Sequence, residues 1–128
     1  MNIKAIQNVV AAIIKKNNLY FIAQRNKHKH LGLKWEFPGG KVHLNESFKE
    51  ALLREIKEEL NISIKIHNKI AEENFKDDKI NVKLHYFICT HISGSILLTE
   101  HEDYAWVEKK DFHKYDFAEG DSDILSLL

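Results

Sequence analysis

The stretch ESFKEALLREIKEEL, residues 46–60, constrains the fold of this chain more than any other segment. Its apolar residues recur three and four positions apart, a spacing that places side chains on one face of an α-helix. These residues are Phe48, Ala51, Leu52, Ile56 and Leu60. We therefore predict a helix over residues 46–60, with Asn45 as its N-cap. Asn61 can end the helix, because asparagine tolerates the left-handed backbone conformation found at that position.

The segments around this helix have the patterns of β-strands. Residues 9–14 form a continuous apolar run, which is typical of a strand buried on both faces. Residues 19–25 predict a second strand, and the polar break between the two indicates a hairpin. Further strands are predicted at residues 62–66, 82–88 and 104–108, and a short helix capped by Asp121 or Ser122 at residues 121–128. This order indicates an α/β fold in which helices pack on a mixed sheet.

Three segments have the composition of loops and turns. Residues 26–36 are polar and aromatic, and residues 75–81 form a turn before the strand that follows. Residues 37–40, FPGG, contain the only proline of the chain and two of its five glycines. This composition predicts a tight and specific backbone path at FPGG.

Length and charge limit the classes of function. The chain has 128 residues, about the length of one domain, so we expect a single domain over residues 1–128. Lys and Arg together number 19, as do Asp and Glu, so the net charge is zero. This balance argues against a surface that holds a nucleic-acid polymer, whereas a local basic cluster would suffice for a small anion.

Cysteine content and the N-terminal sequence bear on location. Cys89 is the only cysteine, so no disulfide can form within the chain, which fits a reducing compartment. Residues 1–16 interleave polar and apolar side chains, and show neither an uninterrupted span of membrane length nor the pattern of a secretion signal. We therefore expect a cytoplasmic protein with no membrane partner.

The predicted helix crowds three glutamates, Glu55, Glu58 and Glu59, onto one side, where their mutual repulsion opposes helix formation. One interpretation is a solvated acidic face with Glu50–Arg54 and Arg54–Glu58 ion pairs, which are common on helices. The other is a site for a divalent cation such as Mg²⁺, since hard cations take oxygen ligands. In the second interpretation Arg54 orients the carboxylates.

The residues that precede the glutamates favour the cation site. Gly40, five residues, Glu46, seven residues and then REIKEELNI at 54–62 closely resemble the Nudix box, G-x5-E-x7-R-E-U-x-E-E-x-G-U, where U is a bulky aliphatic residue. Asn61 stands where the family has glycine, and we expect the helix end to survive this change. The segments VVAAII, FIAQR, WEFPGGKV and EHEDYAWV extend the resemblance to the MutT-like branch and the related CTP pyrophosphohydrolases.

The resemblance implies a Nudix-type α/β/α sandwich with a mixed β-sheet, and a set of metal-binding residues. Glu55, Glu58 and Glu59 match the metal ligands of the family, and the Gly39 carbonyl is implied as a further ligand. Glu100, in the segment TEHEDYAW, matches a further metal-binding or base-like glutamate, with Glu102 as a nearby competitor. The implied cofactor is Mg²⁺, with Mn²⁺ as a substitute.

The implied reaction is hydrolysis of a nucleoside diphosphate linked to another group, commonly a nucleoside triphosphate. In relatives of this branch water attacks the β-phosphorus, and nucleoside monophosphate and pyrophosphate are the products. Bound Mg²⁺ acidifies the water and stabilises charge on the phosphoryl group. A carboxylate, either Glu55 or Glu100, accepts the proton of the water, and Arg54 supports these catalytic glutamates.

Substrate contacts are also implied by the resemblance. The resemblance implies Arg25 and His30 near phosphate or sugar, and Asp121 hydrogen-bonded to the base. From their positions and residue types, we further expect Lys41 to reach phosphate, and Phe37 and Phe87 to border the base. Each has a structural alternative: a solvated charge for the cations, a core position for the aromatic rings and a helix N-cap for Asp121. A carboxylate at Asp121 would accept hydrogen bonds from an amino group such as that of cytosine.

The expected substrates are therefore an oxidised nucleotide such as 8-oxo-dGTP, or a cytosine nucleotide such as CTP or dCTP. An alternative is hydrolysis of ADP-ribose or a dinucleoside polyphosphate, although some ADP-ribose-specific relatives carry a proline downstream of the box and this chain has only Pro38. A second alternative is a non-catalytic nucleotide sensor, which the complete set of box glutamates disfavours. The expected partner is a small-molecule nucleotide, bound by a monomer or a homodimer.

Overall fold

The computed structural model describes residues 5–128, and its strands form one mixed sheet with the path β3-β2-β1-β6-β5. The strands are β1 (Gln7–Lys16), β2 (Leu19–Gln24), β3 (Trp35–Glu36), β4 (Gly39–Lys41), β5 (Ser63–Lys76), β6 (Asn81–Ser93) and β7 (Asp103–Glu108). β1 is central: it runs parallel to β6 and antiparallel to β2 and β4. β7 adds to the sheet by antiparallel pairing with β2.

The apolar run in β1 is buried as the sequence predicts, with residues 10–14 covered from both sides. β1 and β2 form the predicted hairpin, whose turn places Asn17 in the left-handed conformation with φ of 55°. Burial of β1 from both sides requires a layer on each face of the sheet.

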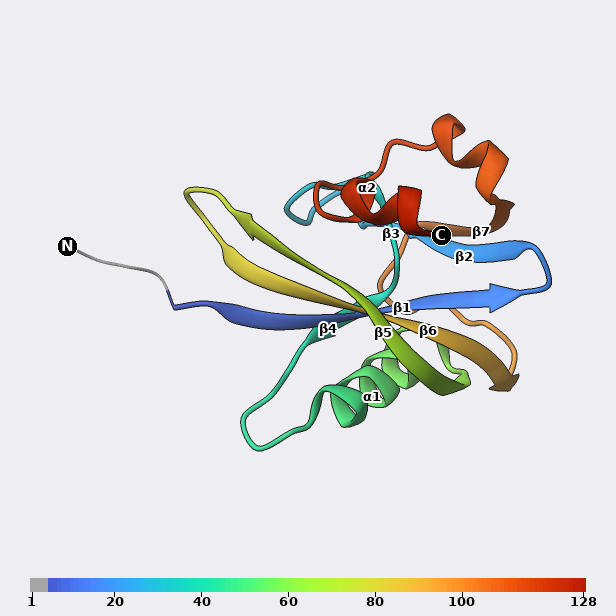
Figure 1. Cartoon of the computed structure of the whole chain (residues 1–128), viewed down its shortest axis with the longest axis horizontal. Coiled ribbons are helices and arrows are strands. Elements are labelled where there is room, and N and C mark those ends of the chain that lie inside the picture. Colours follow the sequence, from blue (N-terminus) through green and yellow to red (C-terminus); the bar gives the residue numbers. More distant parts are fainter. Residues whose placement is uncertain (1–4) are drawn as a thin grey trace.

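Helices supply these two layers, as Figure 1 shows. Helix α1 (Phe48–Leu60) covers one face, where its apolar stripe packs on Val10, Ala12 and Ile14 of β1. The C-terminal elements cover the other face, where Phe112 and Ile124 pack on Ala11 and Ile13. These elements are η1 (Lys109–Lys114), α2 (Asp121–Ile124) and η2 (Leu125–Leu127). The predicted α/β/α sandwich is therefore confirmed.

None of the helices within residues 5–128 is long and apolar enough to cross a membrane.

The start of α1 differs from the prediction, whereas its end agrees with it. Ser47 is the N-cap, and it forms a capping box with Glu50 in which each side chain bonds the backbone N–H of the other residue. Asn45 lies in the preceding turn in left-handed conformation, so its prediction as the N-cap is wrong. Ser47 is the better cap because glutamate follows it three residues later. The two side chains together accept hydrogen bonds from two backbone N–H groups that have no partner within the helix. Asn61 ends the helix at φ 60° and ψ 30°, as predicted.

The region predicted as loop and turn, residues 26–40, contains two short strands, β3 and β4. β4 lies against β1 so closely that a Cβ at Gly39 would stand 1.8 Å from the Val10 carbonyl oxygen. Close backbone approach is thus the reason for glycine here. This approach places the residues after FPGG directly beside α1.

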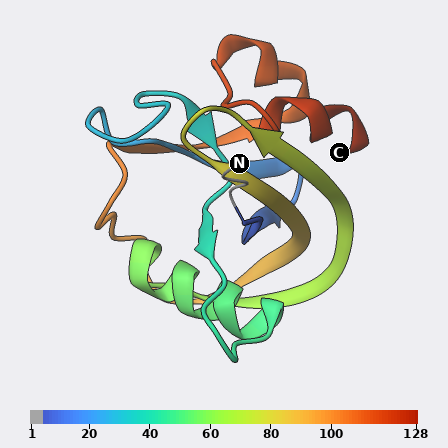
Figure 2. The same ribbon diagram turned by 90° about the vertical axis from the view of Figure 1, so that its left-hand side faces the viewer.

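β5 and β6 are much longer than their sequence patterns predict, and together they form a long antiparallel hairpin. The hairpin curves around one side of the molecule in Figure 2. Its tip, residues 77–80, comes near the loop after β2, where His30 Nε2 lies 2.9 Å from Asp77 Oδ2. The tip therefore forms one wall of the region described next.

Candidate active site

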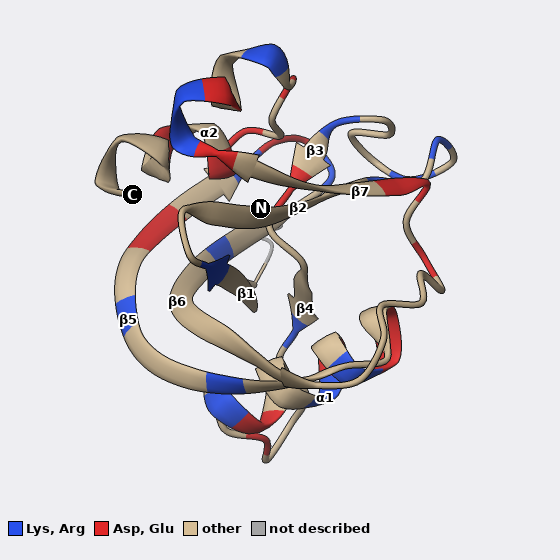
Figure 3. Ribbon diagram, turned by 90° about the vertical axis from the view of Figure 1, so that its right-hand side faces the viewer, with Lys and Arg blue, Asp and Glu red and all other residues tan. Residues whose placement is uncertain are grey.

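A cavity of about 650 Å³ opens between α1, β4, the loop after β2 and the tip of the β5–β6 hairpin. All but one of the residues predicted from the sequence to bind metal or substrate line it, the exception being Phe87: Arg25, His30, Phe37, Gly39, Lys41, Arg54, Glu55, Glu58, Glu59, Glu100 and Asp121. Acidic residues of α1 and of the segment that enters β7 lie on the same side of the molecule in Figure 3. The structure thus brings together residues that are far apart in the sequence.

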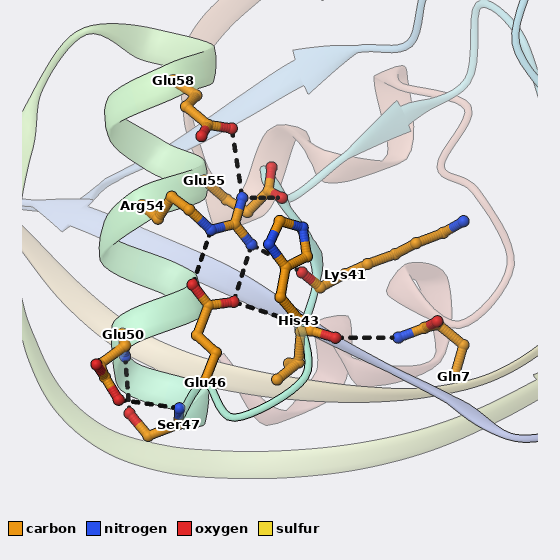
Figure 4. Close-up of polar contacts among 10 residues, drawn as sticks. Gln7, Lys41, His43, Glu46, Ser47, Glu50, Arg54, Glu55 and Glu58 are labelled. Carbon is orange, nitrogen blue, oxygen red and sulfur yellow. Dashed lines mark hydrogen bonds and ion pairs between the residues drawn. The ribbon is translucent and has the colours of Figure 1, made fainter.

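Arg54 stands at the centre of the acidic part of the site (Figure 4). It binds Glu46 through two N–H···O contacts of 2.8 and 3.0 Å, and Glu55 through a third of 2.8 Å. Weaker contact with Glu58 at 3.3 Å and a bond of 3.0 Å to the Lys41 carbonyl use its remaining donors. All five N–H groups of the guanidinium are therefore satisfied by protein, which leaves none for a substrate.

Glu46 is the partner that fixes Arg54. The hydrogen bonds from Arg54 and from the backbone N–H of His43 lower the pKa of Glu46 to about 2. The ion pair expected between Glu50 and Arg54 does not form, because Glu50 takes part in the capping box one turn earlier. The Arg54–Glu58 pair of the same interpretation is present.

Glu55 is held from two directions. Arg54 binds one of its oxygens, and Gly40 lies so close that a Cβ there would stand 2.3 Å from the Glu55 carboxyl carbon. Glycine at position 40 therefore leaves room for this carboxylate. The spacing between Gly40 and Glu55 in the sequence has its physical reason in this contact.

Glu59 lies on the inner side of α1 and is only 8% exposed. Burial raises its pKa to about 9, and the negative charges of Glu36 and Glu55 contribute to the increase. Its Oε1 atom is buried and has no hydrogen-bond partner among the described residues. A buried carboxylate oxygen without a donor is costly unless a proton or a cation compensates it.

The segment that carries Glu100 is tied to the end of α1. Thr99 donates its hydroxyl to the Glu58 carbonyl at 2.8 Å and its backbone N–H to the Glu59 carbonyl at 3.2 Å. These carbonyls are the ones that a helix C-terminus leaves without an intrahelical partner. Glu100 therefore reaches the cavity, where it pairs with Lys29 at 2.6 Å. The hydrogen bond from Lys29 lowers the pKa of Glu100.

Glu102, the competitor of Glu100, does not line the cavity. One of its carboxylate oxygens accepts the backbone N–H of Lys27 at 3.2 Å. The geometry therefore distinguishes the two glutamates, which the sequence could not do.

Arg25 directly follows the last residue of β2, and its guanidinium lies in the cavity wall. Its Nε donates to the His30 carbonyl at 2.8 Å, and its Nη1 donates to Glu36 at 2.7 Å. Within residues 5–128, Nη2 has no hydrogen-bond partner. Lys41 also reaches the cavity, and its side chain extends away from Arg54 in Figure 4. Both cations can therefore meet an anionic ligand.

Asp121 is buried at the start of α2, but it does not cap this helix. Gly120 occupies the N-cap position and no side chain caps α2, so the prediction of Asp121 or Ser122 as the cap is wrong. The Asp121 carboxylate is directed inward, where it accepts the Phe37 backbone N–H at 3.0 Å and the Tyr86 hydroxyl. Burial raises its pKa to about 7, and the charge of Glu36 adds to this effect.

The two predicted aromatic neighbours of a base behave differently. Phe37 lines the cavity, although only 3% of it is exposed. Phe87 packs in the core beneath α1, on the opposite face of the sheet, so its prediction beside the base is wrong. Alternation along β6 explains this, because Val82 and Leu84 line the cavity while Phe87 has the other parity.

Comparison with known proteins agrees with this geometry. The family model of the NUDIX domain matches residues 5–128. The chain is a member of the Nudix family. It is 32% identical over 117 residues to the CTP pyrophosphohydrolase of Escherichia coli (strain K12), which covers 91% of this chain and 87% of that protein. It is 36% identical over 120 residues to the 8-oxo-dGTP diphosphatase of Buchnera aphidicola subsp. Schizaphis graminum (strain Sg). This match covers 91% of this chain and 88% of that protein. The crystal structure of the MutT protein from Methanosarcina mazei Go1 superposes with a TM-score of 0.87 at 26% identity, covering 97% and 93%.

The acidic residues of this Nudix protein fit a hard divalent cation in their chemistry. The available ligands are carboxylate and carbonyl oxygens, and the buried Oε1 of Glu59, which has no hydrogen-bond partner within residues 5–128, is one that a cation would compensate. As the side chains lie, no three acidic, histidine or cysteine groups within residues 5–128 are close enough together to hold a metal ion. Glu58, with 60% of its side chain exposed, is free to turn toward Glu55 and Glu59.

Several residues that line the Nudix site were not assigned a role from the sequence. Glu36 and Lys29 are the partners of Arg25 and Glu100, and Phe75 and Ile80 belong to the apolar wall at the hairpin tip. Glu36 had a detectable signal, since it is an ionisable residue between two aromatic ones in WEF. The hairpin tip had none, because its place in the cavity depends on the length of β5 and β6.

The raised pKa of Asp121 predicts a pH dependence of stability. The folded state keeps this proton up to about pH 7, whereas the unfolded chain loses it near 3.8, so Asp121 makes the protein less stable as the pH rises between these values. Asp121→Asn removes the titration: its amide oxygen can accept the Phe37 N–H, and its amide N–H can donate to the Tyr86 hydroxyl, which reverses the direction of that bond. The free energy of unfolding of the variant, minus that of the wild type, should therefore increase between pH 4 and 7. The increase should be at most about 4 kcal/mol. Urea unfolding at several pH values without metal measures this, and a constant difference between the two proteins would contradict it.

Proposed function

We propose that this Nudix hydrolase converts a nucleoside triphosphate and water into a nucleoside monophosphate and pyrophosphate. The observation that carries the proposal is the composition of one cavity, whose wall combines the glutamates of the Nudix box, the free edge of Arg25 and the buried carboxylate of Asp121. Its volume of about 650 Å³ is within the usual range of small-molecule sites. The names of the Escherichia coli and Buchnera relatives support the same reaction class.

In this proposal Glu55, Glu58, Glu59, Glu100 and the Gly39 carbonyl would hold Mg²⁺, with Mn²⁺ as a substitute. Bound there, it would acidify a coordinated water and screen the charge of the phosphates. Arg54 holds Glu55 in place, and the exposed Glu58 side chain would complete the ligand set. Glu55 or Glu100 accepts the proton of the water.

The protein side of the reaction follows from the cations and carboxylates of the cavity wall. The Nη2 group of Arg25 and the Lys41 ammonium bind phosphate oxygens, which reduces repulsion between the substrate and the glutamates. The water oxygen bonds to the β-phosphorus, and the bond from this phosphorus to the oxygen bridging the α- and β-phosphates breaks. The nucleoside monophosphate leaves with that oxygen.

For the base, we propose a contact with Asp121. Both carboxylate oxygens already accept one hydrogen bond from protein, so they are fixed in place, and each can still accept another. An ionised Asp121 suits an amino group such as that of cytosine, and a protonated one can donate to an acceptor. The substrate classes that fit are CTP or dCTP and an oxidised purine nucleotide such as 8-oxo-dGTP.

The reaction is tested by following pyrophosphate release from CTP, dCTP, dGTP and 8-oxo-dGTP, with and without Mg²⁺. We expect Mg²⁺-dependent release that is highest on one cytosine nucleotide or on 8-oxo-dGTP. ADP-ribose yields no pyrophosphate, so its turnover is followed as AMP. Turnover of ADP-ribose alone, or binding without turnover of any nucleotide, would contradict the proposal.

Glu58→Gln should lower turnover by about 100-fold or more, because it removes one charge from the proposed cation site. The fold should survive, since the Glu58 side chain is mostly exposed. Glu50→Gln is the matched control on the same helix, and glutamine serves equally well in a capping box. Activity close to that of the control would refute the metal-binding role of Glu58.

Asp121→Asn should change the ranking of the nucleotides more than it lowers turnover of the best one. The amide presents a donor and an acceptor where the carboxylate presents only acceptors, while its oxygen can still accept the Phe37 N–H and its N–H can donate to the Tyr86 hydroxyl. The measurement is kcat/KM for each nucleotide of the panel. An equal loss on all of them would show that Asp121 does not contact the base.

A further inference from the structure

His101 is a buried side chain that neither the Nudix box nor the proposed reaction uses. It follows Glu100 directly, in a segment fixed at both ends: Thr99 bonds to the end of α1, and the Glu102 N–H donates to the Gln24 carbonyl at 2.9 Å. Glu100 is about half exposed, whereas the His101 side chain is only 3% exposed. The backbone therefore directs two consecutive side chains to different environments.

The inward direction of His101 brings it to Glu36. His101 Nε2 lies 2.9 Å from Glu36 Oε2, across 65 positions of sequence. The carboxylate oxygen can only accept, so Nε2 carries the proton. Nδ1 is buried without a hydrogen-bond partner among the described residues, so the contact with Glu36 is the one hydrogen bond that this ring makes among them.

Glu36 contacts Arg25 as well as His101. Its other oxygen accepts Arg25 Nη1 at 2.7 Å, and its side chain is only 16% exposed. Burial alone would raise the pKa of Glu36, but the hydrogen bond from His101 and the charge of Arg25 outweigh burial and lower it. Glu36 is thus an anion with one donor on each oxygen.

Arg25 is consequently oriented from two sides. The His30 carbonyl accepts Nε–H and Glu36 accepts Nη1–H, whereas Nη2, which has no partner among residues 5–128, is left for the cavity. Exposed ion pairs such as Lys29–Glu100 hold their partners weakly, whereas a buried carboxylate that loses one donor is strongly destabilised. The chain from His101 through Glu36 is therefore the firmer constraint on this side of the cavity.

We propose that His101 is a positioning residue: through Glu36 it orients Arg25 toward the phosphates, and it joins this orientation to the segment that carries Glu100. The phosphate-binding part of this inference rests on the proposed function. The orientation of Arg25 does not, and it can be measured without any nucleotide.

The test compares His101→Gln with His101→Asn. The glutamine amide can take the place of Nε2 and donate to Glu36, whereas the asparagine amide is one methylene shorter and corresponds to Nδ1. The two variants match in polarity, so a purely structural role of a buried polar group would affect both alike. His67→Ala, a change at an exposed histidine of β5 outside the cavity, is the control.

The first readout is the NMR signal of the Arg25 Nη1–H group, the donor to Glu36, in the metal-free protein, assigned by its loss in Arg25→Lys. The wild type, His67→Ala and His101→Gln should show this signal protected from exchange, and His101→Asn should lose the protection. Equal protection in His101→Asn and His101→Gln would overturn the proposal. This outcome is independent of whether the protein hydrolyses any nucleotide.

The second readout is steady-state kinetics on the best nucleotide of the panel. His101→Asn should raise KM by about 10-fold with a smaller change in kcat, and His101→Gln should restore KM to within about 3-fold of the wild type. In an Arg25→Ala background, His101→Asn should raise KM no further, because the oriented group is absent. Additive effects of the two substitutions would overturn the link to Arg25. If no nucleotide is turned over, the proposed function fails and the NMR result still decides the orientation.

Discussion

The acidic part of the active site depends on one guanidinium group, that of Arg54. Its five N–H donors connect a loop residue, Glu46, the β4 carbonyl of Lys41 and the helix carboxylates Glu55 and Glu58. Without this cation, carboxylates one turn apart on α1 would repel one another and the loop before the helix would lose its anchor. The spacing of the Nudix box therefore places Glu46, Glu55 and Glu58 within hydrogen-bonding distance of Arg54. Because every donor is used by protein, Arg54 holds the site together and does not bind the substrate.

The C-terminal end of α1 supplies a second constraint. A helix leaves its last carbonyls without partners, and here the segment before β7 donates to them: Leu97 N–H bonds to the Leu60 carbonyl, and Thr99 bonds to those of Glu58 and Glu59. The same bonds that complete the helix bring a distant part of the chain, with Glu100, to Glu58 and Glu59. Secondary structure and site geometry are thus satisfied by one set of contacts.

Local signals explain most of what the sequence could predict. The helix, its end at Asn61 and the burial of β1 follow from periodicity and from single-residue preferences. The sequence does contain the signal for the true N-cap, since Ser47 is followed three residues later by Glu50, the spacing of a capping box. Asn45 is followed at that distance by Phe48, which cannot complete such a box. The short strands β3 and β4 could not be predicted, because they exist only through pairing with β2 and β1.

The same distinction between local and long-range contacts applies to the residues of the site. The glutamates on α1 lie together because helical spacing is local, and the metal role assigned to them remains a prediction. Glu36 and His101 meet across 65 positions, so no pattern in either segment contains information about the other. The burial of Asp121 likewise depends on Tyr86 and Phe37, which come from different strands and loops.

The carboxylates in and beside the cavity fall into two groups, according to whether the protein supplies a cation for them. Glu46 and Glu36 each have an arginine, which keeps them ionised although they are largely covered. Glu59 is buried on α1, and its Oε1 has no hydrogen-bond partner among the described residues. Burial and the negative charges of Glu36 and Glu55 raise its pKa, so a proton compensates this carboxyl in the metal-free protein. A cation bound beside Glu59 would have to take the place of that proton. A divalent cation is the partner whose charge and ligand preference match this arrangement.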